Sequence, residues 1–187
     1  MGPRQRRRGA VTIPRMAQIR WKPSVTVAAI AWRIIDGTPR YLLVEEHTAE
    51  GLRLNNPAGH LDPGESPLQA VVRECLEETA CAFVPQALLG VYLSRFVRPA
   101  KDERPAEDIT YLRFAYTGTV GEPEPGRALD DGIVRTLWLS DDEMRASAAR
   151  HRSPLLLRCL DDLLAGVRHP LDTVWADPAL AHPTPKS

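Results

Sequence analysis

The sequence has few cysteines and few aromatic residues, and it has no long hydrophobic run. Its three cysteines, without C-x-x-C spacing, argue against a disulfide framework and against a zinc site, and they fit thiols kept reduced in a cytosol. No stretch approaches the roughly 18 consecutive apolar residues of a membrane span, and no charged leader precedes an apolar block with a small-residue cleavage site. We therefore expect a cytoplasmic protein without a membrane partner.

The chain is nevertheless rich enough in apolar residues to bury a core. Hydrophobic residues make up 43% of its 187 residues and charged residues 26%, unlike a disordered or low-complexity chain. The length suits one domain with tails better than two domains. The predicted division is a basic flexible arm over residues 1–20, a globular domain over 21–172 and a Pro-rich tail over 173–187.

The formal net charge of zero is the sum of two unequal parts. Residues 1–20 carry six arginines and no acid, which leaves 18 basic against 24 acidic residues in the rest, a net charge of −6. The arm lacks apolar periodicity, and Met16 is an alternative start of translation within it. A basic arm can bind nucleic acid, but these arginines say little about function, and we do not expect a nucleic-acid partner.

Apolar periodicity predicts a hairpin at the start of the globular domain. Residues 24–31 have the period and the β-branched content of a strand, a turn follows at 36–39, and residues 41–44 form a second strand. Gly, Pro and Asn are frequent in residues 47–65, which we expect to form a loop.

A helix with clear boundary signals follows this loop. Ser66 is a good N-cap residue, Pro67 suits the first helical position, and Gln69 stands three residues after Ser66, as in a capping box. We expect the helix to run to about Thr79.

The sequence of the second half of the globular domain predicts further strands and two C-terminal helices. The strands are expected over residues 88–97, 109–119 and 133–139. Ser140, with Glu143 in capping-box spacing, opens one helix, and Ser153 with Pro154 opens another that ends at Gly166. From residue 169 onward, where prolines are frequent, we expect an extended or frayed tail. This order of elements predicts an α/β domain built on a mixed sheet.

The early helix concentrates acidic residues on one side. At about 100° per residue, Glu78 lies about 40° from Glu74 and Glu77 about 60° away in the other direction, so the three carboxylates share one face. The opposite face is apolar and can pack on the sheet. Its residues are Leu68, Val71, Val72 and Cys75.

Two interpretations of this acidic face stay open. It is either a solvated surface or a cation site. Glu74 and Glu78 are like charges four residues apart, and Glu77 and Glu78 lie in the last turn, where the helix dipole disfavours anions. Each effect is only a few tenths of a kcal/mol, but together they favour a functional site. Clustered carboxylate oxygens suit Mg²⁺ or Mn²⁺ rather than zinc.

Six residues of this region also stand at a fixed spacing. Gly59 is followed by five residues and Glu65, then by seven residues and the sequence RECLEETAC. This resembles the Nudix box, G-x5-E-x7-R-E-U-x-E-E-x-G-U, in which U is a bulky apolar residue. The residues that match are Gly59, Glu65, Arg73, Glu74, Glu77 and Glu78. Ala80 stands where the family has glycine, and because a left-handed conformation costs more for Ala than for Gly, we expect a small geometric adjustment.

The resemblance to the Nudix hydrolases implies a fold and an activity. The fold would be an α/β/α sandwich, and the activity a Mg²⁺-dependent hydrolysis of a diphosphate linked to another group, with Mn²⁺ as a second candidate metal. Glu74, Glu77 and Glu78 would be the metal ligands, with the Gly59 carbonyl oxygen as a further candidate. Glu65 and Arg73 would orient the loop and the helix through a charge-assisted hydrogen bond.

The sequence leaves the general base open. Glu74 is one candidate, and Asp130 or Asp131, just before the strand at 133–139, is another. The alternative for these two aspartates is a turn beside Gly132.

Histidine and aromatic side chains are weaker candidates for a site. For His60 we expect a surface position. Core packing is the expectation for three tryptophans, Trp32, Trp138 and Trp175. Four aromatic residues lie in predicted strands, where one or two could line a pocket for a pyrimidine or another ring: Tyr92, Phe96, Tyr111 and Phe114.

The stretches that flank the box resemble a phosphatase subgroup of these hydrolases. That resemblance implies hydroxymethylpyrimidine diphosphate, thiamine diphosphate and nucleoside di- and triphosphates as substrates, with release of orthophosphate. One alternative is a housecleaning nucleoside triphosphate pyrophosphohydrolase, which would release pyrophosphate. Another is a module that binds nucleotides or nucleic acid, against which the intact set of acids argues. We expect a small-molecule diphosphate partner and a monomer or homodimer.

Overall fold

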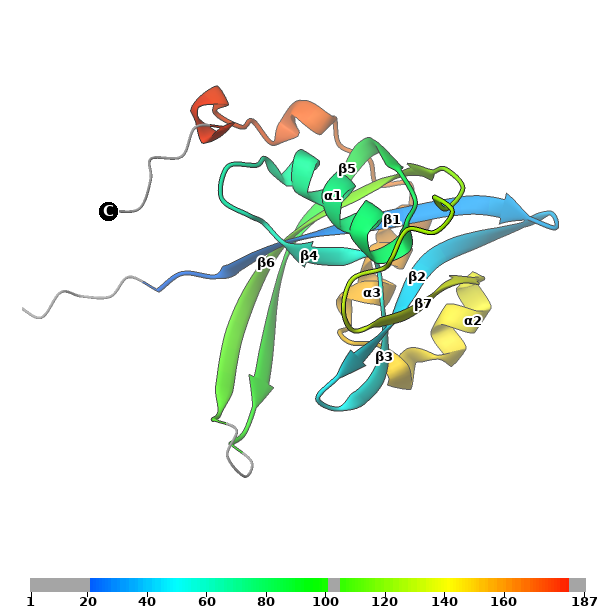
Figure 1. Cartoon of the computed structure of the whole chain (residues 1–187), viewed down its shortest axis with the longest axis horizontal. Helices are drawn as coiled ribbons and strands as arrows, with labels where there is room; N and C mark the ends of the chain where they lie inside the picture. The colour runs from blue at the N-terminus through cyan, green and yellow to red at the C-terminus, as the bar shows by residue number, and fades with distance from the viewer. Residues whose placement is uncertain (1–20, 101–104, 182–187) are drawn as a thin grey trace, which may run out of the picture.

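The structure, a computed structural model, describes residues 21–100 and 105–181 (Figure 1). The basic arm over residues 1–20 and the end of the tail lie outside these described residues. The strands are β1 (Ser24–Ile35), β2 (Thr38–Thr48), β3 (Gly51–Asn55), β4 (Ala58–His60), β5 (Phe83–Arg98), β6 (Glu107–Val120) and β7 (Ile133–Leu139). The α-helices are α1 (Pro67–Thr79), α2 (Asp141–Ala146) and α3 (Leu155–Leu164). Within the described parts of the chain, no helix has the length and apolarity needed to cross a membrane.

The strands form one mixed sheet in which β1 is the branching point. The main order is β3-β2-β1-β6-β5, with β4 paired to β1 and β7 paired to β2. β1 and β6 are parallel, whereas the other pairs are antiparallel. On its other edge β1 pairs first with β4, over residues 26–28, and then with β2, over residues 32–35. The β2–β3 hairpin therefore diverges from the long β5–β6 hairpin (Figure 1).

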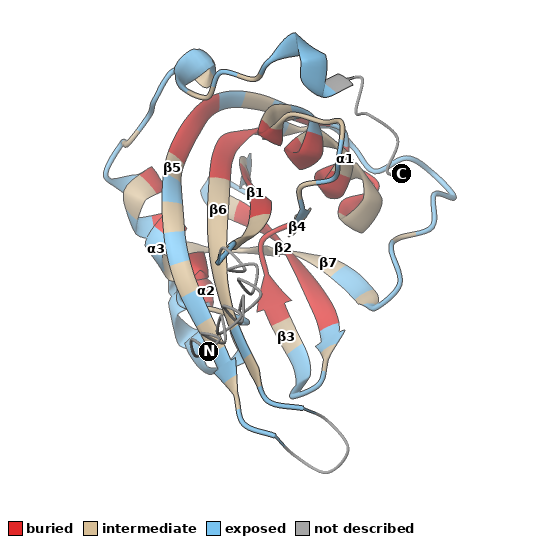
Figure 2. Cartoon of the chain, turned by 90° about the vertical axis from the view of Figure 1, so that its left-hand side faces the viewer, coloured by how far each residue is buried: buried red, intermediate tan, exposed pale blue. Residues whose placement is uncertain are grey.

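Helices cover both faces of this sheet, which confirms the predicted α/β/α sandwich. Alternate residues of β1 divide between the two faces. Val27, Ala29 and Ala31 belong to the cluster under α1, and Ala28 and Ile30 to the cluster under α3. Figure 2 shows that the buried residues concentrate where the strands pass between the helices. β1 is apolar on both sides because neither of its faces meets solvent there.

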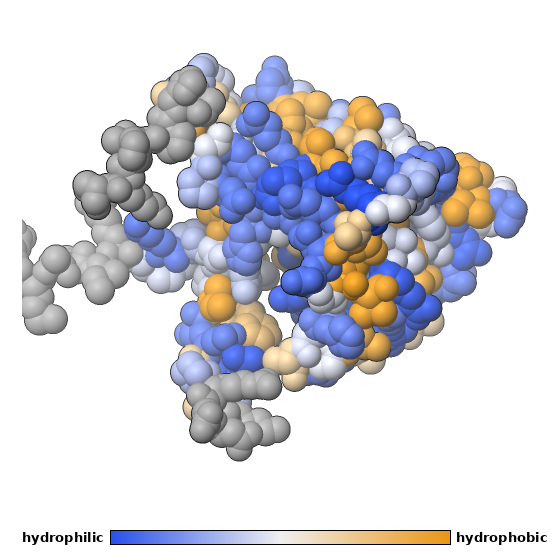
Figure 3. All heavy atoms as spheres, viewed as in Figure 1, coloured by the Kyte–Doolittle hydropathy of each residue, from blue (hydrophilic) through white to orange (hydrophobic). Residues whose placement is uncertain are grey.

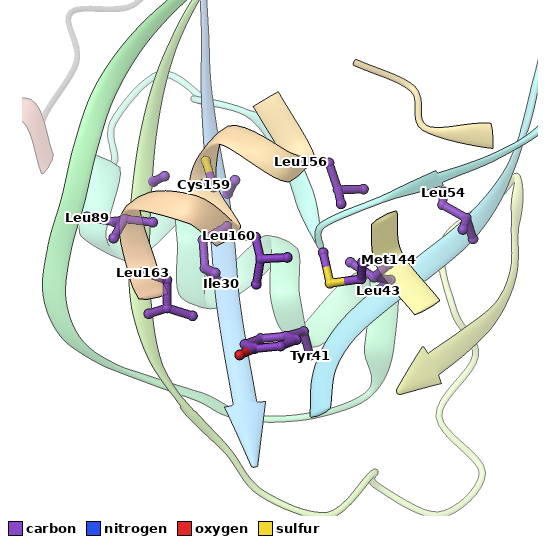
Figure 4. Packing of buried hydrophobic residues seen from close by; sticks show 12 residues of the cluster. Ile30, Tyr41, Leu43, Leu54, Leu89, Met144, Leu156, Cys159, Leu160 and Leu163 are labelled. Carbon is purple, nitrogen blue, oxygen red and sulfur yellow. The ribbon is translucent and has the colours of Figure 1, made fainter. Parts of the chain in front are cut away.

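The core under α3 is a leucine-rich contact with β1 and β2. Leu156, Leu160 and Leu163 of α3 are buried, and Figure 4 shows Leu160 beside Ile30. Full burial of one such side chain contributes about 1.5–3 kcal/mol. This contact fixes the position of the C-terminal segment against the sheet. The three cysteines are free and buried, as the sequence predicted.

The boundaries of α1 follow the predicted signals. The Ser66 hydroxyl accepts a hydrogen bond from the Gln69 backbone N–H, and the Gln69 side chain accepts one from the Ser66 N–H, which completes the capping box. At the other end Ala80 has a φ of 59°, the left-handed conformation expected for the residue that replaces the glycine of the Nudix box. Thr79 stabilises this turn because its hydroxyl accepts a hydrogen bond from the Cys81 N–H at 3.1 Å.

Two predictions of secondary structure are wrong. The expected loop over residues 47–65 contains β3 and β4, because β3 is short and its burial rises along the strand from the exposed Leu52 to the buried Leu54, so it shows no period of two. Ser153 does not cap α3. Pro154 occupies the N-cap position with no side-chain cap hydrogen bond, so the Ser153 hydroxyl lies one residue too early to reach the free N–H groups.

Two predictions about the tail and the tryptophans also need correction. The chain after residue 169 is not simply extended, since it contains short 3₁₀ turns at Leu171–Thr173 and Pro178–Ala181. Trp175 is 76% exposed and does not belong to the core. Trp32 and Trp138 do pack against the two core clusters. Apolar character alone could not separate the three, because only the latter two lie on strands of the sheet.

Candidate functional site

Three carboxylates converge at the C-terminal half of α1. Oxygen atoms of Glu74, Glu77 and Asp130 all lie within 4.8 Å of one another. Asp130 comes from the loop before β7, and its backbone N–H donates to the Glu77 carbonyl oxygen at 3.1 Å. Asp131, the sequence-predicted alternative, is exposed and does not belong to this group of described acids. The fold thus adds to the helix one acid that is distant in sequence.

Arg73 holds two of these acids, Glu74 and Glu77, in place. Its guanidinium donates to Glu65 at 2.7 and 3.1 Å, to Glu74 at 2.8 Å and to Glu77 at 2.8 Å. It also donates to the His60 carbonyl oxygen at 3.0 Å. The predicted ion pair between Arg73 and Glu65 is therefore present. The hydrogen bonds to Glu65 raise the pKa of Arg73, and Arg73 in turn lowers the pKa of Glu65.

Glu74 is held against the backbone of β4. The residue is buried, and burial raises the pKa of its carboxyl group although Arg73 opposes the shift. A Cβ atom placed on Gly59 would lie 2.1 Å from the Glu74 carboxylate carbon. Glycine at this position is thus required by close approach and not by an unusual backbone angle.

Glu78 has a different environment from the other acids of α1. Its carboxylate accepts a hydrogen bond from the Ala58 N–H at 2.8 Å and so ties the helix to β4. Burial raises the pKa of Glu78 to about 8, and the negative charges of Glu46, Glu74 and Asp130 act in the same direction. The structure therefore places Glu78 beside the three convergent acids rather than among them.

The residues present fit a divalent metal ion. Glu74, Glu77 and Asp130 supply hard oxygen donors from two separate segments, which is the chemistry that Mg²⁺ and Mn²⁺ prefer and zinc does not. Three acids held this close repel one another, and Arg73 offsets only part of that repulsion. Hydrophilic residues gather over α1 on this face of the molecule (Figure 3).

A cavity of about 590 Å³ lies between the diverging hairpins, next to β4, which carries Gly59. Figure 3 shows this face hollowed beside the β5–β6 hairpin. His60, which is exposed as expected, lines the cavity with Tyr111, and their ring centroids are 6.3 Å apart. Phe96 lines it as well. The prediction that one or two strand aromatics line a pocket is confirmed for Tyr111 and Phe96.

The other two strand aromatics have structural roles. The Tyr92 hydroxyl donates to Asp162 of α3 at 2.8 Å, which fixes the helix on the sheet. Phe114 packs against the core under α1.

Sequence reasoning missed a set of charged residues that joins β2 to β7 and to the segment before α3. Glu45 and Glu46 are buried on β2. Arg135 and Arg150 donate to Glu45, and Arg152 donates to Glu46. The available signal was that two adjacent acids directly follow an apolar strand segment. Carboxylates buried at the end of such a strand need positively charged or hydrogen-bonding partners. The partners themselves are about 90 to 106 residues away in sequence and could not be assigned from it.

Comparison with known proteins agrees with the geometry. The model of the NUDIX domain matches residues 25–159. Phosphatase NudJ of Escherichia coli (strain K12) is 32% identical over 155 residues, which cover 82% of this chain and 92% of that protein. A solved NUDIX hydrolase from Nitrosomonas europaea is 46% identical, covers 83% of this chain and 98% of its own, and has a TM-score of 0.71. The MutT NUDIX hydrolase from Burkholderia pseudomallei, which covers 76% of this chain and 99% of its own, shares the fold at 21% identity and a TM-score of 0.57. The chain belongs to the NUDIX domain family and is a Nudix hydrolase that acts on pyrophosphate bonds.

Proposed function

We propose that this hydrolase is a Mg²⁺-dependent phosphatase that releases orthophosphate from small molecules carrying a diphosphate. The observation that carries the proposal is the convergence of Glu74, Glu77 and Asp130 next to the cavity beside Gly59. The similarity to the phosphatase NudJ supports orthophosphate as the product. The proposed substrates are hydroxymethylpyrimidine diphosphate, thiamine diphosphate and nucleoside di- and triphosphates.

The proposed roles follow from the contacts of each side chain. Glu74, Glu77 and Asp130 would hold Mg²⁺, or Mn²⁺ in its place, with Glu78 and the Gly59 carbonyl oxygen as further candidate ligands. When bound, the metal supplies charge neutralisation of the diphosphate and a lower pKa for bound water. Arg73 positions the Glu74 and Glu77 carboxylates, which its guanidinium contacts directly.

Two acids are the proposed general bases. Glu74 is buried, and its raised pKa favours a carboxylate that can accept and return a proton. Asp130 is the alternative from the late loop because it lies within the group of three acids, whereas Asp131 does not. The domain over residues 21–172 would carry the whole activity, so a chain that begins at Trp21 is expected to keep it.

A panel of substrates tests the proposal. The full chain is incubated with Mg²⁺ and thiamine diphosphate, UDP or a nucleoside triphosphate, and both orthophosphate and pyrophosphate are measured. We expect orthophosphate from each compound. Pyrophosphate from the triphosphate would contradict the proposal and indicate a nucleoside triphosphate pyrophosphohydrolase.

Two glutamine variants provide the matched comparison. Glu77→Gln removes one charge from the acid group and should lower turnover about 100-fold or more, as expected when a metal ligand is lost. Glu122→Gln changes an acid whose side chain is 83% exposed and should leave turnover within twofold. Salt-sensitive nucleic-acid binding that survives Glu77→Gln, without turnover in the unaltered chain, would indicate a binding module instead.

A further inference from the structure

Arg113 lies in a row of side chains that crosses the sheet at the floor of the cavity. It is opposite Thr26 of β1 on one side and Tyr92 of β5 on the other. Thr26 is opposite His60 of β4, so the side chains of this row point to the same face. α3 covers the neighbouring part of that face, where Ala28 packs, but Arg113 lines the cavity.

The Arg113 guanidinium makes few hydrogen bonds. Its Nη1 atom is shielded from solvent and has no hydrogen-bond partner among the residues that the structure describes. Its Nε atom reaches only the Thr26 hydroxyl, at 3.5 Å. Three of the four other arginines that line the cavity are ion-paired, namely Arg95 with Asp108, Arg98 with Glu107 and Arg152 with Glu46, whereas Arg53 is without an ion pair to any described residue. Burial lowers the pKa of Arg113, although an arginine side chain stays charged in any case.

A shielded donor without an acceptor costs free energy, so its retention favours a ligand that supplies the acceptor. The negative charges of Glu46 and Glu78 act on the charge of Arg113. A ligand is therefore needed to accept hydrogen bonds from its N–H donors rather than to balance its charge. The planar guanidinium can donate two parallel hydrogen bonds to the edge of a heteroaromatic ring.

The surroundings of Arg113 suit a flat ring. Tyr111 is two residues away on the same strand and lines the same cavity, as do His60 and Phe96. Arg113 is two strand spacings from His60, which is about 9–10 Å between the strands. A ring at Arg113 would therefore lie within reach of a diphosphate held beside Gly59.

We propose that Arg113 is a specificity-determining residue that donates hydrogen bonds to a carbonyl oxygen or ring nitrogen of the heteroaromatic group on the substrate. This assignment rests on the proposed function, because it concerns the part of the substrate that is attached to the diphosphate. Phe96 and Tyr111 provide the apolar surface for the ring, and Arg113 donates hydrogen bonds to the polar atoms at its edge.

Steady-state kinetics with two compounds tests this role. UDP carries a ring with acceptors, whereas tripolyphosphate has none. In Arg113→Met we expect the KM for UDP to rise about 10- to 100-fold, as for loss of a hydrogen bond to a charged group. The ratio of kcat/KM for UDP to that for tripolyphosphate should fall by a similar factor. Arg145→Met changes an arginine of α2 that does not line the cavity and whose side chain is 44% exposed, and it should alter this ratio less than twofold.

Calorimetric binding of UMP without metal gives a second measurement that does not depend on turnover. The dissociation constant should rise at least about tenfold in Arg113→Met and in Arg113→Gln. The second variant keeps the test decisive if the first does not fold. A wild-type chain that turns over neither compound contradicts the proposed function, whereas UMP binding still tests Arg113.

Thermal unfolding separates ligand binding from a structural role. Because the Arg113 Nη1 atom has no partner to lose, the free Arg113→Met protein should melt at the wild-type temperature or above it. Three results would overturn the assignment. They are a clear fall in melting temperature, an unchanged ratio of kcat/KM, and a KM for tripolyphosphate that rises as much as that for UDP.

Discussion

Replacement of Gly59 by alanine should separate the stability of the fold from the placement of Glu74. The added Cβ atom would lie 2.1 Å from the Glu74 Cδ and Oε2 atoms and 2.2 Å from Oε1. Ordinary van der Waals contact begins at 3.4 Å. The carboxylate must therefore move by at least about 1.3 Å, the difference between 3.4 and 2.1 Å.

The expected cost to stability is modest because only the end of a flexible side chain has to move. The movement breaks the 2.8 Å hydrogen bond from Arg73 to Glu74. Loss of one charge-assisted hydrogen bond costs about 1.5–3 kcal/mol, and Arg73 retains its bonds to Glu65 and Glu77. Unfolding curves should thus show a folded variant with a lower midpoint.

The expected cost to turnover is larger. Misplacement of a reacting group by about 1 Å lowers a rate roughly 100-fold, which corresponds to about 2.7 kcal/mol in the activation barrier. We expect kcat for UDP in Gly59→Ala to fall by about that factor at saturating Mg²⁺. Gly121→Ala is the matched control, since its Cβ would meet no atom within 4 Å, and it should keep wild-type kcat. A kcat within threefold of wild type in a folded Gly59→Ala variant would refute the argument that the Glu74 position limits turnover.

Three other perturbations address the loop acid, a buried charge and a thiol. Asp130→Asn should lower kcat at least about tenfold, while Asp131→Asn should not, and the reverse order in the same assay would transfer the role to Asp131. Arg135→Met removes one partner of the buried Glu45 and should cost about 1–2 kcal/mol in denaturant unfolding at pH 7. Arg135 lowers the pKa of Glu45, so this deficit should shrink as the pH falls below the ordinary value of 4.5; a constant deficit would contradict the ion pair. Burial raises the pKa of the Cys75 thiol to about 12, so alkylation at pH 8 should be much slower in the native protein than after unfolding, and rapid labelling of the native protein would contradict its burial.

Local signals in the sequence predicted the local structure well. The capping boxes that begin at Ser66 and Ser140 both form, and the strand expected at 133–139 has those bounds in the structure. Each depends on contacts within a few residues, so the sequence order contains the necessary information. Ser153 shows the limit of such signals, because α3 begins one residue later, with Pro154 at the N-cap and no side-chain cap hydrogen bond.

The prediction of long-range charges was poorer, because a pairwise contact leaves no periodicity in the sequence. Arg113 is unremarkable as one basic residue in a strand. Its importance arises only when β6 pairs with β1 and places it opposite Thr26, with its Nη1 atom shielded from solvent. The same holds for Glu46, whose partner Arg152 lies just before α3.

Asp130 and Asp131 show most simply why a contact between distant residues cannot be predicted from the sequence. They are adjacent and chemically identical, so no pattern of composition or spacing can distinguish them. The structure distinguishes them through the backbone, since the Asp130 N–H donates to the Glu77 carbonyl oxygen at 3.1 Å and the Asp130 carbonyl oxygen accepts from Ile133 at 3.0 Å. The first bond fastens the loop to the end of α1, the second closes a turn within the loop, and the Asp130 carboxylate lies close to that of Glu74. Because the helix end sets this position, a change that displaces the left-handed turn at Ala80 should also displace Asp130. Ala80→Gly should keep the left-handed turn at a lower conformational cost, so we expect the group of three acids to stay in place.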